Sequence, residues 1–296
     1  GGKHFVSENV LILMIMRTIK MHTIIRAHRG VSFWMFGWRR ALSNRLFASE
    51  STTEDILVRD YIFRSLYDHS SGYFTKDVIN AATKPIDFHN LWGKWEYDNI
   101  VAEMYQQKPG SWMTPVEIFM PHYSEAVARY ILEQLEKAPL VGHEKLAIIE
   151  IGGGSGTNAV CILDYIRRMS PSVYKRLRYS IVEISPQLSR AQSTRLLSEG
   201  HSVNLAQSVQ GDILCLSPSG QKEQLWPGID APPPLTVDQL SPPGARQFVI
   251  AMEVLDNLPH DKVQWDPARG TLAETVVAWP AAAEEGAAAA AIERAR

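Results

Sequence analysis

Glycines and acidic residues follow directly after an apolar run in the middle of this chain. The run Leu146–Ile149 leads into Glu150–Thr157, which reads EIGGGSGT. An apolar run bounded by glycines predicts a buried strand, and the glycines let the backbone turn sharply and approach a ligand closely. Helical periodicity follows over Asn158–Met169. The loop therefore directs a helix N-terminus at whatever binds there.

The spacing of the glycines narrows the choice of ligand. A dinucleotide fingerprint, G-x-G-x-x-G, would require glycine where Thr157 stands, and a phosphate-binding P-loop would require a lysine that is not present. This disfavours a nucleotide-dependent oxidoreductase. What remains is an acid followed by alternating glycines, at Glu150, Gly152, Gly154 and Gly156. That pattern resembles the first loop of S-adenosyl-L-methionine (SAM) methyltransferases.

From Lys145 onward, strand-like runs alternate with helical patterns, which predicts an α/β fold with a doubly wound, Rossmann-like parallel sheet. The expected strands are Leu146–Ile151, Arg178–Ile184, Val203–Val209 and Gln247–Met252. Ligands of such sheets bind beyond the carboxyl ends of the strands. Each expected strand ends at or near an acidic residue, and these are Glu150, Glu183, Asp212 and Glu253.

The acidic residues after the first three strands suit the parts of SAM. Glu183 can accept hydrogen bonds from both ribose hydroxyls, although an acid before a helix can also simply stabilise the helix dipole. Asp212 can accept from the adenine amino group while Ile213 packs on the ring. Glu150 either positions the glycine loop or contacts the methionine ammonium. The predicted cofactor site is Glu150, Gly152, Gly153, Gly154, Glu183, Asp212 and Ile213.

The segment after the fourth strand predicts the side of the site that holds the methyl acceptor. A guanidinium acceptor is always protonated in solution, and carboxylates can orient it and offset its charge. Glu253 and Asp256 lie three residues apart at this point and are the predicted catalytic pair. Asn257 and His260 add polar contacts. The alternatives are that Asp256 and Asn257 cap the next helix, and that His260 is a satisfied loop residue.

Composition excludes several classes of function. The 296 residues carry a net charge of -2, which indicates neither a nucleic-acid nor a membrane-surface partner. The two cysteines, Cys161 and Cys215, show no metal-ligand or disulfide spacing, so no metal is expected.

Residues 1–49 are basic with a single acid, Glu8, and predict a mitochondrial transit peptide. Plastid import and a basic surface helix are the alternatives. The apolar run Val10–Met16 is too short to span a membrane.

The remaining domain boundaries follow from periodicity and composition. Residues 50–144 predict a helical module, with helices over Thr53–Tyr67, Phe88–Gln106 and from Pro121 onward. Ser51–Glu54 resembles a capping box for the first helix. Residues 145–280 form the predicted SAM-binding domain. Its loop over residues 217–246 holds seven prolines and predicts irregular structure. Residues 281–296 are an alanine-rich, solvated tail.

Taken together, these motifs resemble the MidA-type methyltransferase family. The resemblance covers Thr53–Val263 and rests on the glycine loop, on Val182–Pro186 (VEISP) and on Glu253–Asp261 (EVLDNLPHD). The helical module adds Ser71–Phe74 (SGYF) and Met113–Glu117 (MTPVE). The family includes a mitochondrial protein arginine methyltransferase that modifies a subunit of respiratory complex I during assembly. The resemblance implies the same cofactor, a matrix location, a protein substrate and a contribution of Thr114 and Glu117 to the substrate side.

The sequence also departs from the family pattern. Met252 stands where the family usually has Asn, and Val254 and Leu255 replace two aromatics, which indicates a divergent branch. Gly153 and Ser155 are smaller than the usual residues in the glycine loop. Thr271–Val277 is expected as a fifth strand, and the closing strands of the usual sheet are expected to be truncated. The competing interpretation is a non-catalytic assembly partner that retains a SAM-binding fold.

Overall fold

The computed structural model describes residues 10–15, 53–68, 72–76, 85–107, 113–217 and 235–280. The chain divides into two compact units. The first comprises residues 1–15 and 66–256, and the second comprises residues 16–65 and 257–296. Each unit is described by itself. The tail over residues 281–296 lies outside the described residues.

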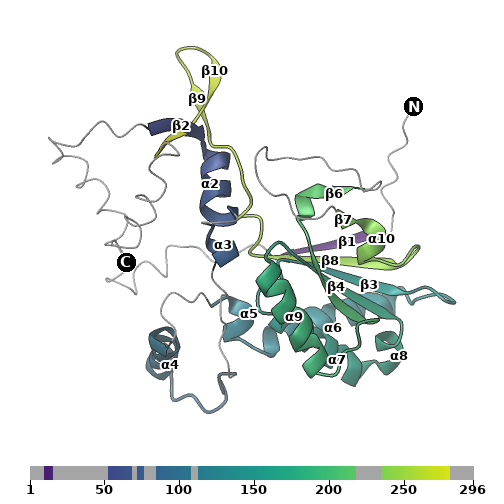
Figure 1. The fold of residues 1–296 in the computed structure, drawn as a ribbon. Coiled ribbons are helices and arrows are strands. Elements are labelled where there is room, and N and C mark those ends of the chain that lie inside the picture. Colours follow the sequence, from purple (N-terminus) through teal and green to yellow (C-terminus); the bar gives the residue numbers. More distant parts are fainter. Residues whose placement is uncertain are drawn as a thin grey trace, which may run out of the picture. The chain divides into compact units, whose positions relative to one another are not determined.

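The first unit is built on a five-stranded sheet whose strands all run parallel (Figure 1). The strand order is β1-β8-β3-β4-β5. Their bounds are β1 Val10–Ile15, β3 Leu146–Ile151, β4 Leu177–Glu183, β5 Ala206–Gln210 and β8 Arg246–Met252. The predicted α/β fold is thus confirmed, and the expected third strand begins three residues later than its sequence pattern indicated.

The two faces of the sheet are buried against different partners. Ile148 and Ile181 join a core cluster with residues of α6 (His122–Lys137) and α7 (Thr157–Met169). Their neighbours Ile149 and Val182 point to the other face and pack with Leu235 and Leu240. This alternation follows from the two-residue period of a strand, and it explains why β3 is apolar on both faces apart from Glu150.

The proline-rich segment corrects one prediction. Residues 218–234 lie outside the described residues, but part of the rest of this loop is regular. It contains β7 (Leu235–Thr236) and α10 (Val237–Leu240), and β7 pairs in parallel with β6 (Leu216–Ser217). Figure 1 shows α10 and β7 on the face of the sheet opposite α6, α7 and α9 (Pro186–Ser198). Leu235 and Leu240 are buried there, so this segment supplies an apolar cover that prolines alone did not suggest.

The helical module also differs from its predicted boundaries. Glu54 lies in a strand, β2 (Thr53–Leu57), so the proposed capping box is wrong and α2 covers only Val58–Tyr67. The next helix, α4, begins at Lys94 rather than Phe88 and ends at Gln107. Short helices α3 (Tyr73–Lys76), α5 (Pro115–Ile118) and α8 (Pro171–Tyr174) complete the set. The predicted helix after Pro121 is confirmed as α6.

The second unit explains why β2 is a strand. It pairs antiparallel with β11 (Val276–Pro280), and Tyr61 packs edge-on against Trp279 at 5.6 Å between ring centroids. A hairpin of β9 (Val263–Asp266) and β10 (Thr271–Glu274) precedes β11. The expected fifth strand over Thr271–Val277 is therefore wrong. The segment forms parts of two strands, and neither joins the central sheet.

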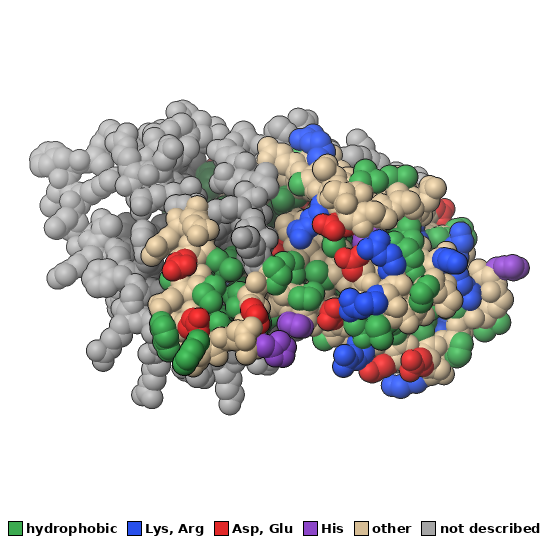
Figure 2. Space-filling model, turned by 90° about the horizontal axis from the view of Figure 1, so that it is seen from below, with side chains coloured by type: hydrophobic (Ala, Val, Ile, Leu, Met, Phe, Trp, Pro, Cys, Tyr) green, Lys and Arg blue, Asp and Glu red, His purple; other side chains and the backbone are tan. Residues whose placement is uncertain are grey.

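The basic N-terminal segment contributes one described element. Val10–Ile15 forms β1 at the edge of the central sheet, paired with β8. The rest of residues 1–49 lies outside the described residues, so the transit peptide stays a prediction. No helix in the described ranges is long and apolar enough to cross a membrane. On the face drawn in Figure 2, basic and acidic side chains are interspersed.

Candidate functional site

The carboxyl ends of four parallel strands meet at one edge of the sheet in the first unit. Ile151 at the end of β3 lies opposite Val182 of β4 and Ala251 of β8, and Glu183 lies opposite Gln210 of β5. Strands β4 and β5 extend the sheet on one side of β3, whereas β8 lies on its other side. The strand order therefore reverses between β3 and β8. Ligands of open α/β sheets bind at such a reversal.

The glycine loop leaves β3 at this point with an unusual backbone. Gly152, Gly154 and Gly156 have φ values of 68, 53 and 81°, a region that side chains with a Cβ disfavour. A Cβ on Gly153 would lie 2.6 Å from Ile181 Cγ2, whereas one on Gly154 would have no atom within 4 Å. The loop therefore packs tightly at Gly153 and opens at Gly154. A ligand can therefore approach the backbone of the loop at Gly154.

Glu150 lies beneath the loop and is 3% exposed. Its carboxylate accepts hydrogen bonds from Asn158 Nδ2 at 2.7 Å and from the Tyr179 hydroxyl at 2.9 Å. Burial raises the pKa of Glu150, and the two hydrogen bonds act in the opposite direction. Of its two predicted roles, these contacts favour positioning of the loop, because Asn158 belongs to the first turn of α7.

Glu183 is buried at the end of β4, in the position expected for a ribose ligand. One oxygen accepts from the Ser185 amide at 3.0 Å, and the other accepts from Gln192 Nε2 at 2.9 Å. Burial raises the pKa of this carboxyl to about 7. Each carboxylate oxygen has two lone pairs, so both oxygens retain capacity for a ribose hydroxyl.

Asp212 follows β5 and begins a short 3-10 helix over Ile213–Cys215. Its carboxylate accepts from the Leu214 amide at 2.9 Å, and burial raises its pKa. Ile213 is half-buried and packs against the cluster that contains Ile149 and Val182. Asp212 is therefore fixed at the same edge as Glu183, where the adenine was predicted.

Glu117, which the resemblance assigned to the substrate side, contacts the glycine loop. It is 6% exposed on α5, and its carboxylate accepts from Ser155 Oγ at 2.7 Å and from Thr157 Oγ1 at 2.9 Å. Both donors belong to the glycine loop. Thr114 precedes α5, and its backbone carbonyl accepts from the Glu117 and Ile118 amides. These two hydrogen bonds connect α5 to the glycine loop.

The predicted catalytic pair lies at the end of β8. Glu253 has a φ of 53°, the only positive φ outside glycine among the described residues. Residues held in this region are strained and concentrate at functional sites. Glu253 is half-buried and Asp256 is exposed. Asn257 and His260 belong to the second unit, where His260 Nδ1 lies 2.8 Å from the Leu258 carbonyl. No helix follows in the described residues, so the alternative that Asp256 and Asn257 cap one is wrong.

Two tyrosines near these carboxylates were not anticipated from the sequence. Burial raises the pKa of the Tyr67 phenol, and the charges of Asp212, Glu183 and Asp256 raise it further. Burial and the charge of Glu253 raise the pKa of Tyr123. Tyr67 thus lies within electrostatic reach of the predicted cofactor acids, and Tyr123 within reach of the acceptor side. Neither belongs to a motif, so no sequence signal marked them.

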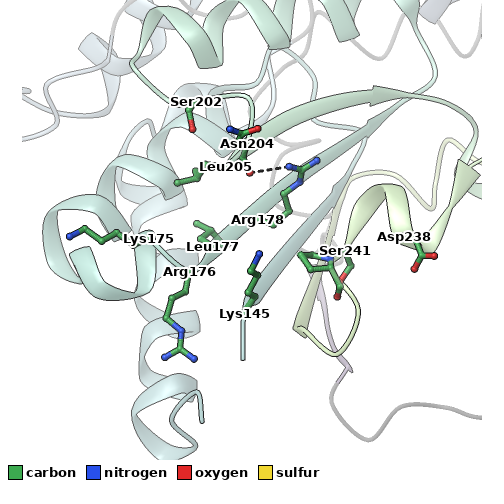
Figure 3. Close-up of a pocket in the computed structure, with 11 residues that line it drawn as sticks. Lys145, Lys175, Arg176, Leu177, Arg178, Ser202, Asn204, Leu205, Asp238 and Ser241 are labelled. Carbon is green, nitrogen blue, oxygen red and sulfur yellow. Dashed lines mark hydrogen bonds between the residues drawn. The ribbon is translucent and has the colours of Figure 1, made fainter. Parts of the chain in front are cut away.

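A separate cavity of about 320 Å³ lies at the amino ends of β3 and β4. Its polar lining includes Lys145 and Arg178 (Figure 3). Figure 3 shows Arg178 turned toward Asn204, and its guanidinium donates to the Asn204 carbonyl at 2.9 Å. Lys175 and Arg176 point away from Asn204. None of the predicted site residues lines this cavity.

In the described part of the chain, no group of three or more His, Cys, Asp or Glu is placed to hold a metal.

Comparison with known protein families finds one match. A family profile described as "Putative S-adenosyl-L-methionine-dependent methyltransferase" matches residues 126–294, more than half of the chain. The chain belongs to this family. The resemblance to MidA-type methyltransferases is thereby confirmed, and the cofactor is SAM. No curated protein matches the chain.

Solved structures resemble this chain over part of their length. One, from Burkholderia thailandensis and bound to S-adenosyl-homocysteine, is 19% identical, with a TM-score of 0.43, over 81% of this chain and 49% of its own. A native structure of an uncharacterized protein from the same organism is 18% identical, with a TM-score of 0.39, over 79% and 46%. DszA carbon methyltransferase matches 31% of this chain and 24% of its own, with 23% identity and a TM-score of 0.25. The chain spans about half the length of the first two.

Proposed function

We propose that this methyltransferase transfers a methyl group from SAM to arginine side chains of a protein substrate. The observation that carries the proposal is the strained Glu253 at the end of β8, followed by the exposed Asp256. Two carboxylates beside the reversal of strand order suit a guanidinium, which presents several donors in a planar fork.

The chain's own residues have distinct tasks in this proposal. The glycine loop, Glu183 and Asp212 hold the cofactor, which supplies an electrophilic methyl group on a sulfonium. Glu253 and Asp256 bind the guanidinium and aim one of its nitrogens at that methyl group, because transfer by displacement requires an in-line approach. Their negative charge stabilises the cationic guanidinium, and one of the two carboxylates can accept the proton that the methylated nitrogen loses. Tyr123, whose pKa is raised by burial and by the charge of Glu253, remains neutral and can donate a hydrogen bond.

We further propose a mitochondrial location, in the matrix, and a complex I subunit as substrate. The basic, acid-poor composition of residues 1–49 and the resemblance to the mitochondrial family member support this part. The alternative role, a non-catalytic assembly partner that binds SAM, would leave Glu253 without a chemical task.

Methyl transfer can be tested with the full chain, methyl-labelled SAM and purified respiratory complex I subunits. After acid hydrolysis, we expect label in methylarginine with the wild type and no label with Glu253→Gln. Label in methyllysine or in a small molecule would overturn the arginine assignment while keeping the methyltransferase. Binding of SAM without any transfer would favour the non-catalytic partner.

A further inference from the structure

Two hydroxyl groups of the glycine loop lie between a cation and an anion. Arg195 Nη1 donates to Thr157 Oγ1 at 2.7 Å and to Ser155 Oγ at 3.1 Å. Both hydroxyls donate in turn to the carboxylate of Glu117, at distances of 2.9 and 2.7 Å. We call these four residues, Glu117, Ser155, Thr157 and Arg195, the loop clasp.

The hydrogen-bonding roles at the two ends of the loop clasp are fixed by chemistry. A guanidinium can only donate, and an ionised carboxylate can only accept. Both hydroxyl oxygens accept from Arg195, and both hydroxyls lie in position to donate to Glu117. The two hydroxyl oxygens also lie 2.8 Å apart, so either can donate to the other. Hydrogen bonds to charged groups are about twice as strong as neutral ones. The loop clasp is therefore a directional array with a charge at each end.

The loop clasp joins three separate elements at the glycine-rich part of the cofactor loop. Glu117 comes from α5, Thr157 begins α7, and Arg195 comes from α9. Arg195 Nη1 also donates to the Ser155 carbonyl at 3.3 Å. Ser155 lies between Gly154 and Gly156, which have wide conformational freedom. Holding such a segment in one conformation before the ligand arrives removes an entropy cost from binding.

We propose that Glu117 and Arg195 are positioning residues that hold the glycine loop in its cofactor-binding conformation through the hydroxyls of Ser155 and Thr157. This inference rests on the assignment of SAM as cofactor. It moves Glu117 from the acceptor side to the cofactor side. It also gives the four-residue helix α5 a function, namely to carry a carboxylate to the loop.

The test uses the full chain and calorimetric titration of S-adenosyl-homocysteine. Thr157→Val keeps the shape of the side chain but lacks the hydroxyl, whereas Thr157→Ser keeps the hydroxyl. We expect Thr157→Val to weaken binding by about tenfold or more, since it removes hydrogen bonds to charged groups, and Thr157→Ser to bind as the wild type does. Thr194→Val is the matched control, because its exposed hydroxyl on α9 bonds only to the Arg190 carbonyl.

A second pair of variants separates positioning from simple stability. Glu117→Gln and Arg195→Met should each weaken binding, and the double variant should lose less than the product of the two effects, because both act through the same hydroxyls. Unchanged affinity in Glu117→Gln and Thr157→Val would overturn the proposal. If Thr157→Val does not fold, Ser155→Ala decides, since its side chain is only half-buried. Failure of the wild type to bind would instead overturn the cofactor assignment.

Discussion

Gln192 Nε2 lies 2.9 Å from Glu183 Oε2 and 2.8 Å from the Gly154 carbonyl, so one amide ties the predicted ribose ligand to the glycine loop. Its oxygen accepts from Ser208 Oγ at 2.6 Å, and the side chain is fully buried. Because every polar atom of this amide is used, Gln192 has one orientation. It therefore sets the position of both cofactor elements from a single point on α9.

Replacing Gln192 should weaken the cofactor site. In Gln192→Leu the volume is retained, but the Gly154 carbonyl and Glu183 lose a shared donor. We expect the affinity for S-adenosyl-homocysteine to fall by about tenfold, in line with the loss of a hydrogen bond to a charged group. Calorimetric titration measures this, with Ser193→Ala on the same helix as control, since Ser193 bonds only to the Ser189 carbonyl. Equal affinities of Gln192→Leu and wild type would contradict the role given to the amide.

Glu183 should make stability depend on pH. Burial raises its pKa in the folded chain from 4.5 to about 7, so the folded state binds a proton more tightly than the unfolded state. The stability that this carboxyl contributes is complete below about pH 4.5 and is lost as the pH rises through about 7. The difference between the two pKa values corresponds to on the order of 3 kcal/mol once the group is ionised.

The neutral variant Glu183→Gln tests this dependence. Urea unfolding at about pH 5 and about pH 8 should show the variant gaining stability relative to the wild type at the higher pH. The other buried acids are present in both proteins, so the comparison isolates Glu183. The same variant should bind S-adenosyl-homocysteine at least about tenfold more weakly at the higher pH, because its amide nitrogen cannot accept from a ribose hydroxyl as the second carboxylate oxygen does. A stability difference that is the same at both pH values would refute the assigned burial of charge.

Alanine substitutions at two neighbouring glycines should affect stability and cofactor affinity differently. Gly153→Ala places a Cβ 2.6 Å from Ile181 Cγ2 in the core, and we expect a loss of stability of about 1–3 kcal/mol. Gly154→Ala meets no atom but must adopt a φ of 53° on the open side of the loop. It should cost about 1–2 kcal/mol of backbone strain and should also hinder the cofactor. Unfolding and titration of both variants distinguish the two effects, and a larger loss of affinity in a still-folded Gly153→Ala would contradict this division.

The sequence predicted the part of the fold that depends on strong local patterns. The apolar run of β3, the alternating glycines and the acids after β4 and β5 identified the sheet edge and the cofactor correctly. The loop clasp was not predictable, because Arg195 and Glu117 lie 78 residues apart and belong to no shared pattern. Long-range pairing also explains the misassigned Thr53–Leu57. Its apolar positions suit a helix, but antiparallel pairing with β11 overrides that propensity. Tyr67 and Tyr123 approach the site only through tertiary packing.

Glu253 should show a trade-off between stability and activity. Its φ of 53° costs about 1–3 kcal/mol for a residue with a Cβ, and glycine adopts this conformation without that strain. Glu253→Gly should therefore be more stable than Glu253→Gln, in which the strain persists, by about 1 kcal/mol in urea unfolding. Both variants should lose methyl transfer while retaining affinity for S-adenosyl-homocysteine, because Glu253 is assigned to the acceptor and not to the cofactor. Loss of cofactor affinity in Glu253→Gln would move this carboxylate to the cofactor side, and full activity in Glu253→Gly would contradict its assignment to the acceptor.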